Sequence, residues 1–500
     1  MFDRIPDMAA KRAEISPERV AFADVASGRD WSFAQINRAA AGLAAGLRAL
    51  GLGPGDRLAA LCHNRVEFFV ALFAAQKSGI ILAPLNWRQP VAELGPVLDS
   101  VGASAIIFDD ENAAPARALA RSRAMAAIAM DAPAPGETAF AELAAAPAPF
   151  GAGMIDADRP WYLLLTSGTT GLPKAVIQTA RMAWANAVNI GQAADLGADT
   201  ATANFLPLFH TAGINLYALP TFLEGGLSHV LRRFEPDMLF DLIRQGRINR
   251  FFGVPAIYQA FSLRPEADEI DWSALGMGCG GAPLPEPLIR FFAERGGTVC
   301  NGMGMTETGP TVFLMDAANA ARKVGSVGRP QMLTEVRLAG VPDGAPGEGE
   351  IQIRGPNVTP GYFGNDAATA EAFAEDGWLR SGDVGRRDED GYYYIVDRIK
   401  DMYISGGENV YPAEVERVLN AHPAILEAAV IGVPDPKWGE VGMAFLILRP
   451  GGAVEPQALD AWCRERLAAY KTPRAYRILD DFPRTAAGKV RKPELRKMIR

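Results

Sequence analysis

The order of apolar and polar residues predicts strands and helices that alternate along most of the chain. Residues 57–62 form a short apolar run, residues 64–79 carry apolar side chains at helical spacing, and residues 80–85 form a second apolar run. The same order recurs over residues 160–300. Because strands that alternate with helices pair in parallel, this pattern predicts an α/β fold in which helices cover parallel sheets.

The pattern changes near residue 324. From there to residue 397 the chain consists of short β-type runs separated by Gly, Asp and Pro, which predicts a small β-rich subdomain. An α/β pattern resumes behind the charged run at 397–401. We therefore expect two domains, a large N-terminal domain of residues 1–397 and a small α/β C-terminal domain of residues 398–500.

Two segments of biased composition need an interpretation. Residues 109–150 are rich in Ala and Pro, as in a linker or in a variable surface segment, and we favour the surface segment because the flanks look like parts of one fold. The tail at 484–500 holds seven Lys and Arg residues against Glu494. Most of these charges are expected to form a solvated helix face, since no aromatic residue interleaves them as in a nucleic-acid arm.

Composition and charge narrow the class of protein. The chain has 500 residues, enough for roughly three domain-sized units. Its 49% hydrophobic and 22% charged residues are ordinary for a globular protein. The formal net charge of -8 argues against general nucleic-acid binding, which needs a basic face. The start of the chain carries no signal-peptide pattern, and no uncharged apolar run reaches about 18 residues, so no membrane span is expected.

The cysteines point to the same kind of protein. They lie far apart and form no CxxC pair, so a zinc or disulfide framework is not expected. We expect each to be a small buried hydrophobe in the reducing cytoplasm. The four are Cys62, Cys279, Cys300 and Cys463.

The strongest chemical signal lies at residues 161–176, where an apolar strand leads into hydroxyls, glycines and one lysine. Glycines let backbone N–H groups approach an anion, hydroxyls donate to phosphate oxygens, and lysine neutralises charge. No Ser or Thr follows the lysine, so this is not the nucleotide loop of kinases and GTPases. We interpret it as a phosphate-binding loop rather than an ordinary surface turn. Its residues are Thr166, Ser167, Gly168, Thr169, Thr170, Gly171, Leu172, Pro173 and Lys174.

With this loop, the sequence resembles the adenylate-forming superfamily of acyl-CoA synthetases, aryl-CoA ligases, peptide-synthetase adenylation domains and luciferases. The resemblance covers nearly the whole chain and is strongest to bacterial acyl- and aryl-CoA ligases, including feruloyl-CoA-synthetase-like enzymes. It implies a large N-terminal domain of three subdomains and a mobile C-terminal domain. Six further family motifs follow in the family's order, at 206–213, 280–285, 304–307, 380–385, 397–416 and 483–490.

The chemistry implied by this resemblance follows from the weakness of a carboxylate as an electrophile. Attack of the carboxylate on the α-phosphate of ATP yields an acyl-adenylate and pyrophosphate, and the thiol of coenzyme A then displaces AMP. The first step brings two anions together, so the site must offset negative charge with fixed donors, a cation and Mg²⁺. The expected small-molecule partners are a carboxylic acid and coenzyme A, and a homodimer is left open.

The resemblance assigns the nucleotide site residue by residue. The phosphate loop from Thr166 to Lys174 would hold the β- and γ-phosphates, Thr306 the α-phosphate, and Glu307 the Mg²⁺ ion. Asp383 would accept from the ribose hydroxyls, and Arg398 would reach ribose or phosphate. The adenine pocket would be lined by Gly281, Ala282 and Pro283. Met303 stands where the family usually has an aromatic residue, and its polarizable sulfur can still pack against adenine.

Three further residues have implied roles in catalysis. Lys489, in its Gly-Lys context, resembles the mobile-domain lysine that bridges carboxylate and α-phosphate. Lys400 matches the family's hinge, about which the C-terminal domain rotates between two poses; composition alone would make it a surface lysine. His210 matches a residue near the acyl carboxylate, and we favour an orienting or shielding role over proton transfer. The other histidines match no motif and are expected to be structural.

The substrate-binding residues follow from the same family positions. Coenzyme A is expected to contact Gly407, Trp438, Tyr470 and Arg474. The acyl pocket is expected to contain Ala212, Leu216, Gly278, Gly280, Asn301, Gly302 and Pro310. Most of these pocket residues are small or apolar and no arginine is available to clamp a second carboxylate. The sequence therefore favours an aromatic, phenylpropanoid or medium-chain acid, with Asn301 as a hydrogen-bond partner for a ring substituent.

Three alternatives stay open beside an acid–CoA ligase. A stand-alone adenylating enzyme would load the phosphopantetheine thiol of a carrier protein, and Trp438 together with the 500-residue length favours coenzyme A instead. A non-catalytic nucleotide-binding or scaffold protein is opposed by the joint presence of Glu307, Asp383 and Lys489. Luciferase-type oxygenation has no specific signal in the sequence.

Overall fold

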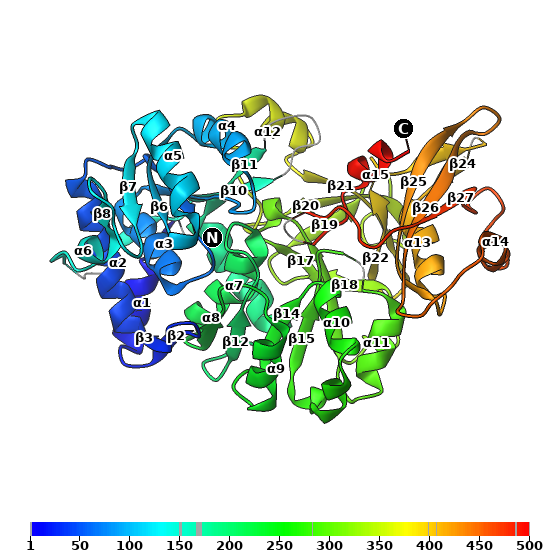
Figure 1. Cartoon of the computed structure of the whole chain (residues 1–500), viewed down its shortest axis with the longest axis horizontal. Helices are drawn as coiled ribbons and strands as arrows, with labels where there is room; N and C mark the ends of the chain where they lie inside the picture. Colours follow the sequence, from blue (N-terminus) through cyan, green and yellow to red (C-terminus); the bar gives the residue numbers. More distant parts are fainter. Residues whose placement is uncertain are drawn as a thin grey trace.

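The computed structural model describes residues 3–149, 153–166, 173–282, 284–398, 400–406, 408–485 and 488–499. Two sheets dominate the first 398 residues (Figure 1). In each of them a run of parallel strands alternates with helices along the chain. This confirms the α/β prediction, including the strand–helix–strand unit expected at 57–85.

The first sheet has seven strands in the described chain, and all its pairs are parallel except β10 with β11. Its two last strands and their helices come from residues 109–150. That segment is therefore part of the fold and not a linker. In spatial order the strands are β11 (Lys174–Thr179), β10 (Pro160–Thr166), β5 (Ile81–Pro84), β4 (Arg57–Leu61), β6 (Ala103–Phe108), β7 (Ala126–Ala129) and β8 (Thr138–Ala139).

The second sheet has thirteen strands in the described chain. Those from β16 to β2 pair in parallel, and the remainder pair antiparallel. In spatial order they are β19 (Glu335–Leu338), β20 (Gly347–Arg354), β21 (Leu379–Arg387), β22 (Tyr393–Arg398), β18 (Ser326–Pro330), β17 (Thr311–Leu314), β16 (Val299–Gly304), β15 (Gly276–Cys279), β14 (Arg250–Gly253), β12 (Ala201–Asn204), β13 (Leu227–Val230), β2 (Val20–Asp24) and β3 (Arg29–Ser32). A short ribbon joins β1 (Arg4–Pro6) to β9 (Met154–Asp156).

The β-rich stretch expected after residue 324 is present, and its strands are continuous with the second sheet. Strand β16 pairs in parallel with β15 on one side and antiparallel with β17 on the other. Through β17 and β18 the antiparallel strands extend the sheet. The change in sequence texture therefore marks a change from parallel to antiparallel pairing within one hydrogen-bonded sheet.

Helices form three layers around the two sheets (Figure 1). The layer between the sheets buries a large apolar cluster and contains α1 (Met8–Ile15), α2 (Phe33–Ala49), α3 (Val66–Ser78), α7 (Ala180–Ala193) and α8 (Ala218–Glu224). The free face of the first sheet is covered by α4 (Val91–Val101) and α5 (Ala113–Arg123). The free face of the second is covered by α9 (Pro236–Arg244), α10 (Pro255–Ser262) and α11 (Glu286–Ala293). The short helix α6 (Phe140–Ala144) adds Phe140 to the apolar cluster of the central layer, and α12 (Asp366–Ala372) buries Ala368 against Val176 and Tyr362.

The C-terminal residues form a separate five-stranded sheet, in which β27 pairs with β26. Its strands are β24 (Glu408–Val410), β23 (Tyr403–Ser405), β26 (Gly439–Leu448), β25 (Ile425–Asp435) and β27 (Ala475–Ile478). Helices α13 (Pro412–Asn420) and α14 (Pro456–Arg464) bury apolar residues on one face, and α15 (Lys492–Lys497) packs on the other. No described helix combines the length and apolar character that a membrane span would need.

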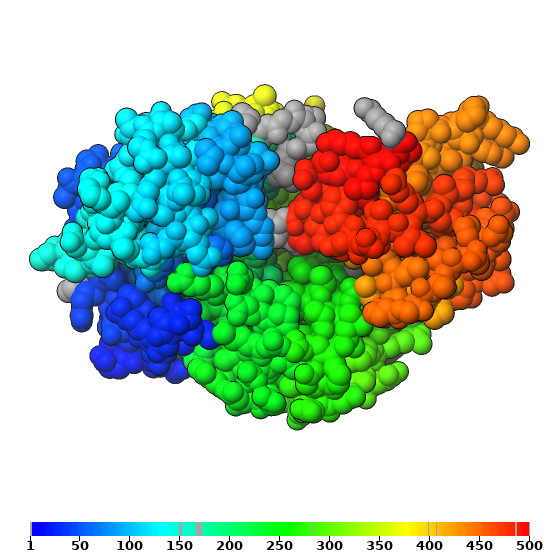
Figure 2. Space-filling view, viewed as in Figure 1, coloured from blue at the N-terminus to red at the C-terminus, as the bar shows by residue number. Residues whose placement is uncertain are grey.

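The last residues of the chain extend from this C-terminal unit toward the rest of the protein. Figure 2 shows them as a red surface at the junction between the N-terminal lobe in blue and cyan and the central lobe in green. The expected domain boundary at 397–401 falls between β22, which belongs to the long sheet, and β23, which belongs to the C-terminal sheet.

Candidate active site

Several predicted site residues follow directly on parallel strands of the second sheet. His210 lies in the segment after β12, Gly281 after β15, and Thr306 after β16. Because these neighbouring strands run in parallel, their carboxyl ends meet at one edge of the sheet. In open α/β sheets this edge is where ligands bind.

The turn that carries Thr306 and Glu307 is held from three directions. It forms a short 3-10 helix, Thr306–Thr308. Gln178 Nε2 donates to the carbonyl oxygen of Thr306 at 2.9 Å. The backbone N–H of Thr359 donates to the carbonyl oxygen of Glu307 at 2.8 Å. Asn357 Nδ2 donates to the carbonyl oxygen of Thr308 at 2.9 Å. These bonds fix the backbone from which the two predicted site side chains project.

The Glu307 side chain fits a cation site. The residue is only 7% exposed, and no Lys or Arg in the described ranges forms an ion pair with it. Its only described side-chain partner is the Tyr362 hydroxyl, which donates to Oε1 at 2.9 Å. A buried carboxylate without a counter-ion is costly. Among the described residues no group of three or more His, Cys, Asp or Glu side chains forms a metal cage, as expected for Mg²⁺ that binds mainly phosphate and water oxygens.

The two described ends of the predicted phosphate loop lie opposite each other. Thr166, at the end of β10, pairs with Lys174, at the start of β11, and its Oγ1 donates to the Lys174 carbonyl oxygen at 3.3 Å. Lys174 Nζ lies 4.9 Å from the centre of the Tyr362 ring. The other five predicted phosphate contacts, Ser167, Gly168, Thr169, Thr170 and Gly171, lie outside the described residues, as does Leu172.

Asp383 and Arg398 are cross-strand neighbours. Asp383 lies inside β21 and is paired in register with Arg398 on β22, so it is not a turn residue. Arg398 Nε lies 3.1 Å from Asp383 Oδ1. Burial raises the pKa of Asp383, while Arg398 and Lys489 oppose that shift. A buried, paired carboxylate at this edge is able to accept hydrogen bonds from vicinal hydroxyls.

Lys489 projects from a short, well-bonded loop of the C-terminal unit. The Thr485 N–H donates to the Lys489 carbonyl oxygen at 2.7 Å, and the Lys489 N–H donates to Thr485 Oγ1 at 3.1 Å. Gly488 has a φ of 81°, which glycine adopts without strain. Arg484, at the base of the loop, is paired with Glu427 on β25. The loop therefore presents the lysine on a braced support.

The Lys489 side chain reaches the edge of the second sheet. A Cβ added to Gly281 would lie 3.8 Å from Lys489 Cε. Burial, and next the charge of Arg398, lower the pKa of Lys489 to about 8, while the carboxylates of Asp383 and Glu307 oppose that shift. The structure thus brings Lys489 together with residues more than 100 positions earlier in the chain.

This electrostatic setting predicts a pH dependence. Lys489 carries its charge below a pKa of about 8 and loses it above. The kcat/KM for acyl-adenylate formation reports ionisations of the free enzyme, so it is expected to fall above about pH 8. In Lys489→Arg the guanidinium stays charged, and the alkaline decline should move to higher pH. A profile of pyrophosphate release from pH 6 to 10 checks this, and identical alkaline limbs in both proteins would contradict it.

His210 is held as a neutral imidazole. Its Nδ1 accepts from the backbone N–H of Ala212 at 3.3 Å, so Nε2 carries the proton in the neutral ring. Burial, assisted by the charge of Lys489, lowers the pKa of His210 to about 4. At neutral pH the ring is therefore suited to donate a hydrogen bond from Nε2, which agrees with an orienting role better than with a cationic one.

The predicted adenine-binding residues are only partly described. Gly281 and Ala282 are exposed at the end of β15, and Pro283 lies outside the described residues. Met303 lies on β16, where it packs against the apolar cluster around Val312 and Phe313. These positions are compatible with a nucleotide at the carboxyl edge of β15 and β16.

The predicted acyl-pocket residues fall on two faces of the sheet. A Cβ added to Gly280 would lie 2.8 Å from Phe252 Cζ and 3.1 Å from the Gly302 carbonyl oxygen, so Gly280 and Gly302 are neighbours. Strand alternation places Asn301 on the face opposite Gly302. There its Nδ2 donates weakly to the Ser326 carbonyl oxygen at 3.5 Å, and its Oδ1 is buried without a partner in the described chain.

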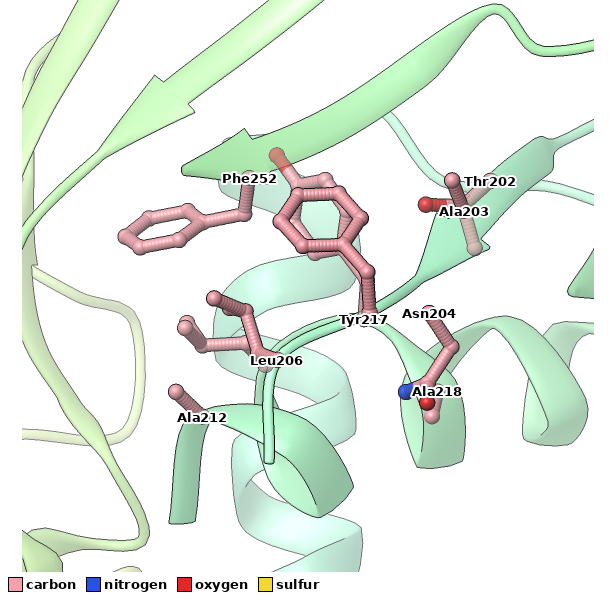
Figure 3. Close-up of a pocket in the computed structure, with 10 residues that line it drawn as sticks. Thr202, Ala203, Asn204, Leu206, Ala212, Tyr217, Ala218 and Phe252 are labelled. Carbon is pink, nitrogen blue, oxygen red and sulfur yellow. The ribbon is translucent and has the colours of Figure 1, made fainter. Parts of the chain in front are cut away.

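Aromatic side chains that the motifs did not indicate close one end of this region. Ala212 and Leu216 pack with Tyr217 and Phe252, whose ring centres are 5.9 Å apart at 75°. Figure 3 shows these two rings close together, with Leu206 and Ala212 beside them. They line a small cavity of about 10 Å³, whose lining also includes the polar residues Thr202 and Asn204. Pro310, also predicted here, is buried next to Gly304.

The described residues that were predicted to bind coenzyme A have their neighbours within the C-terminal unit. Trp438 is 39% exposed and lies against Gly406. Tyr470 packs at the edge of the C-terminal core, and Arg474 is exposed. Gly407 lies outside the described residues. The structure therefore has Lys489, rather than these residues, at the carboxyl edge of the second sheet.

Lys400, the predicted hinge, is exposed on the segment that joins β22 of the second sheet to β23 of the C-terminal sheet. Its amine is nevertheless partly desolvated, and this desolvation together with the nearby charge of Arg398 lowers the pKa of Lys400. Beyond the connection itself, the C-terminal unit touches the rest of the protein through Gln259 on α10, whose Nε2 donates to the Leu426 carbonyl oxygen at 3.3 Å. Val254 lies next to both Gly281 and Gly488.

Several residues with evident structural roles at the site had no signal in the sequence. Gln178, Asn357 and Tyr362 brace Glu307 and its turn, and Gln259 contacts the C-terminal unit. Each makes its contact across 49 or more residues. These residues belong to no motif or periodic pattern of the sequence that could reveal such contacts.

Comparison with known proteins identifies the family. A profile of AMP-binding enzymes matches residues 9–363, and that of the AMP-binding enzyme C-terminal domain matches residues 414–489. The feruloyl-CoA synthase of Amycolatopsis sp is 42% identical over 97% of both chains, and the indoleacetate–CoA ligase of Aromatoleum aromaticum is 36% identical over 94% of both. The o-succinylbenzoate CoA synthetase of Bacillus subtilis, solved with its acyl-adenylate intermediate, has a TM-score of 0.87 at 30% identity, covering 99% of this chain and 98% of that one.

The chain therefore belongs to the AMP-binding enzyme family. Within it, the chain is an AMP-forming acyl-CoA synthetase, an acid–thiol ligase that uses ATP with Mg²⁺ and coenzyme A.

Proposed function

We propose that this ligase activates an aromatic or phenylpropanoid acid, with medium-chain acids as the next class. The observation that carries the proposed reaction is the approach of Lys489 to Asp383, Glu307 and His210 at one sheet edge. The acid class is supported by the apolar, aromatic-lined region at Tyr217 and Phe252. Two relatives, the feruloyl-CoA synthase and the indoleacetate–CoA ligase, are named for acids that carry an aromatic ring.

The nucleotide roles are proposed as follows. Thr166, Lys174 and the loop between them hold the β- and γ-phosphates, and Thr306 donates to the α-phosphate. Asp383 accepts from the ribose hydroxyls, and its pairing with Arg398 opposes the rise in pKa that burial causes. Glu307 holds Mg²⁺, which supplies charge neutralisation between the phosphate oxygens when bound. Gly281, Ala282, Pro283 and Met303 line the adenine site.

Lys489 is the proposed electrostatic catalyst of adenylation. Its ammonium lies where the acyl carboxylate and the α-phosphate would approach each other, and it offsets the negative charge that accumulates as they react. His210 Nε2–H orients the carboxylate as a hydrogen-bond donor. Because the imidazole is neutral, it does not compete with Lys489 as a second cation.

Thioester formation is proposed to use a second arrangement of the C-terminal domain, residues 398–500. Rotation at Lys400 would withdraw Lys489 and bring Gly407, Trp438, Tyr470 and Arg474 toward the acyl-adenylate. The exposure of Trp438 and Arg474 supports this proposal, because both are available to a ligand or to a new domain contact. We place the enzyme in the cytoplasm, on the basis of its free cysteines.

The test is a coupled pyrophosphate-release assay over benzoic, cinnamic, indole-type, medium-chain, acetic and dicarboxylic acids, with coenzyme A or a phosphopantetheinyl carrier protein as acceptor. We expect turnover with ring-bearing acids and free coenzyme A. A strong preference for acetate or a diacid would refute the acid class. Thioester formation on the carrier protein alone would refute coenzyme A as the acceptor.

The proposed acyl pocket leads to a mutational prediction. Ala212 packs beside Tyr217 and Phe252, so the larger side chain in Ala212→Leu should oppose the repacking that admits a ring at this position. We expect kcat/KM for the preferred ring-bearing acid to fall at least about tenfold relative to that for a short straight acid, because volume discrimination in apolar pockets is worth roughly 10–200-fold. Equal losses for both acids would contradict a pocket at this position.

A further inference from the structure

Tyr362 contacts two charged residues of the site although no motif includes it. Its hydroxyl donates to Glu307 Oε1 at 2.9 Å, and its ring lies 4.9 Å from Lys174 Nζ. One aromatic side chain therefore touches both the carboxylate proposed for Mg²⁺ and the lysine proposed for the triphosphate. The residue is 9% exposed, so both contacts are shielded from water.

The backbone around Tyr362 is fixed to the strand that carries Lys174. The Ile177 N–H on β11 donates to the Gly361 carbonyl oxygen at 3.1 Å, and the Phe363 N–H donates to the Ala175 carbonyl oxygen at 2.8 Å. The Tyr362 N–H itself donates to Thr369 Oγ1 at 2.9 Å. The backbone that carries the ring is thus anchored to β11, the strand that begins with Lys174.

The hydrogen bond leaves Glu307 with one oxygen for a ligand. Oε1 accepts from Tyr362, whereas Oε2 has no hydrogen-bond or ion-pair partner among the residues that the structure describes. A tyrosine hydroxyl keeps its proton at neutral pH, so it donates this hydrogen bond. A donor that holds one oxygen of a ligating carboxylate restricts the orientation of the other.

We propose that Tyr362 is a positioning residue for the metal-bound nucleotide. Its hydroxyl holds Glu307 so that Oε2 faces the Mg²⁺ position, and its ring holds the Lys174 ammonium at the triphosphate. This proposal rests on the nucleotide site proposed above. It separates two contributions: the hydroxyl acts only through Mg²⁺, and the ring acts on phosphate binding with or without Mg²⁺.

The experiment measures binding of α,β-methylene-ATP by titration calorimetry, once with saturating Mg²⁺ and once with EDTA. In the unchanged protein, Mg²⁺ should raise the affinity for the nucleotide by a certain factor, and in Tyr362→Phe we expect that factor to be about tenfold smaller. Tenfold is the lower end of the effect of removing a hydrogen-bond partner of a metal ligand. Affinity in EDTA should stay unchanged, because the ring and its contact with Lys174 remain. For Tyr362→Leu the affinity in EDTA should fall as well.

A matched control removes a similar buried hydrogen bond away from the site. Tyr392, 3% exposed, donates to Asp316 Oδ2 at 2.8 Å. Tyr392→Phe should leave both affinities unchanged, and thermal unfolding compares the stabilities of all variants. An unchanged Mg²⁺ gain in Tyr362→Phe, or equal losses with Mg²⁺ and EDTA, would overturn the proposal. Glu307→Gln tests the underlying site separately: if it keeps the full Mg²⁺ gain, the metal role of Glu307 is wrong.

Discussion

Replacing Lys489 with alanine should lower the rate of acyl-adenylate formation by about 10²–10³-fold, the size of effect seen when one preorganised donor to transition-state charge is removed. The reason is that Lys489 reaches the edge where Asp383 and Glu307 lie, and the charges of both carboxylates act on its ammonium. The charge it offsets develops during the reaction, so kcat should fall more than ATP affinity. Acid-dependent pyrophosphate release measures the effect.

The same variant should retain most of the second half-reaction. Thioester formation from a supplied acyl-adenylate and coenzyme A is expected to survive within about tenfold, because the second pose does not need the lysine at the phosphate. Lys497→Ala serves as the control, since Lys497 is an exposed lysine of the same tail whose one ion pair with a described residue is with Glu494. Equal losses in both half-reactions would contradict the separate use of Lys489 in adenylation.

Replacing Lys400 with proline should have the opposite pattern. Proline fixes φ near −65°, so a rotation that depends on this residue's backbone is blocked. The pose with Lys489 at the site should remain accessible, because no backbone hydrogen bond from the Lys400 N–H is formed to a described residue. We therefore expect adenylation to be largely retained and thioester formation to fall by about 10²-fold or more, as for a lost conformational step.

Lys400→Ala separates the backbone effect from the side-chain effect. Alanine removes the amine and keeps φ free, so this variant should carry out both half-reactions at nearly the rate of the unchanged enzyme. Single-turnover measurements that follow the acyl-adenylate and the thioester separately distinguish the two steps. Normal overall turnover in Lys400→Pro would mean that the hinge lies elsewhere.

Much of the fold could be predicted because its signals are local. The alternation of apolar strands with helical spacing at 57–85 and 160–300 reflects which faces each element buries, and the structure has β4, α3 and β5 where this pattern predicts them. The β-rich stretch after residue 324 was also evident. Its continuity with the long sheet was not, because pairing through β17 and β18 leaves no mark on composition.

From the sequence, the residues of the site could be predicted only where a family motif contains them. Spacing alone could not place Lys489 near Glu307 and Asp383, since their proximity depends on how the C-terminal unit docks. The resemblance supplied those residues. Tyr362 stood outside every motif, and its bond to Glu307 spans 55 positions. Asn301 was grouped with Gly302 as a pocket residue, but alternation along β16 directs the Asn301 side chain to the face opposite the one that Gly302 leaves open.

The most direct test of the account is a crystal structure of the protein with α,β-methylene-ATP, Mg²⁺ and a cinnamic-type acid. We predict the triphosphate against the turn between Thr166 and Lys174, the ribose at Asp383, and the Lys489 ammonium between the acid carboxylate and the α-phosphate. A triphosphate bound anywhere else, or a Lys489 side chain directed to solvent while the acid and nucleotide are both bound, would contradict the account.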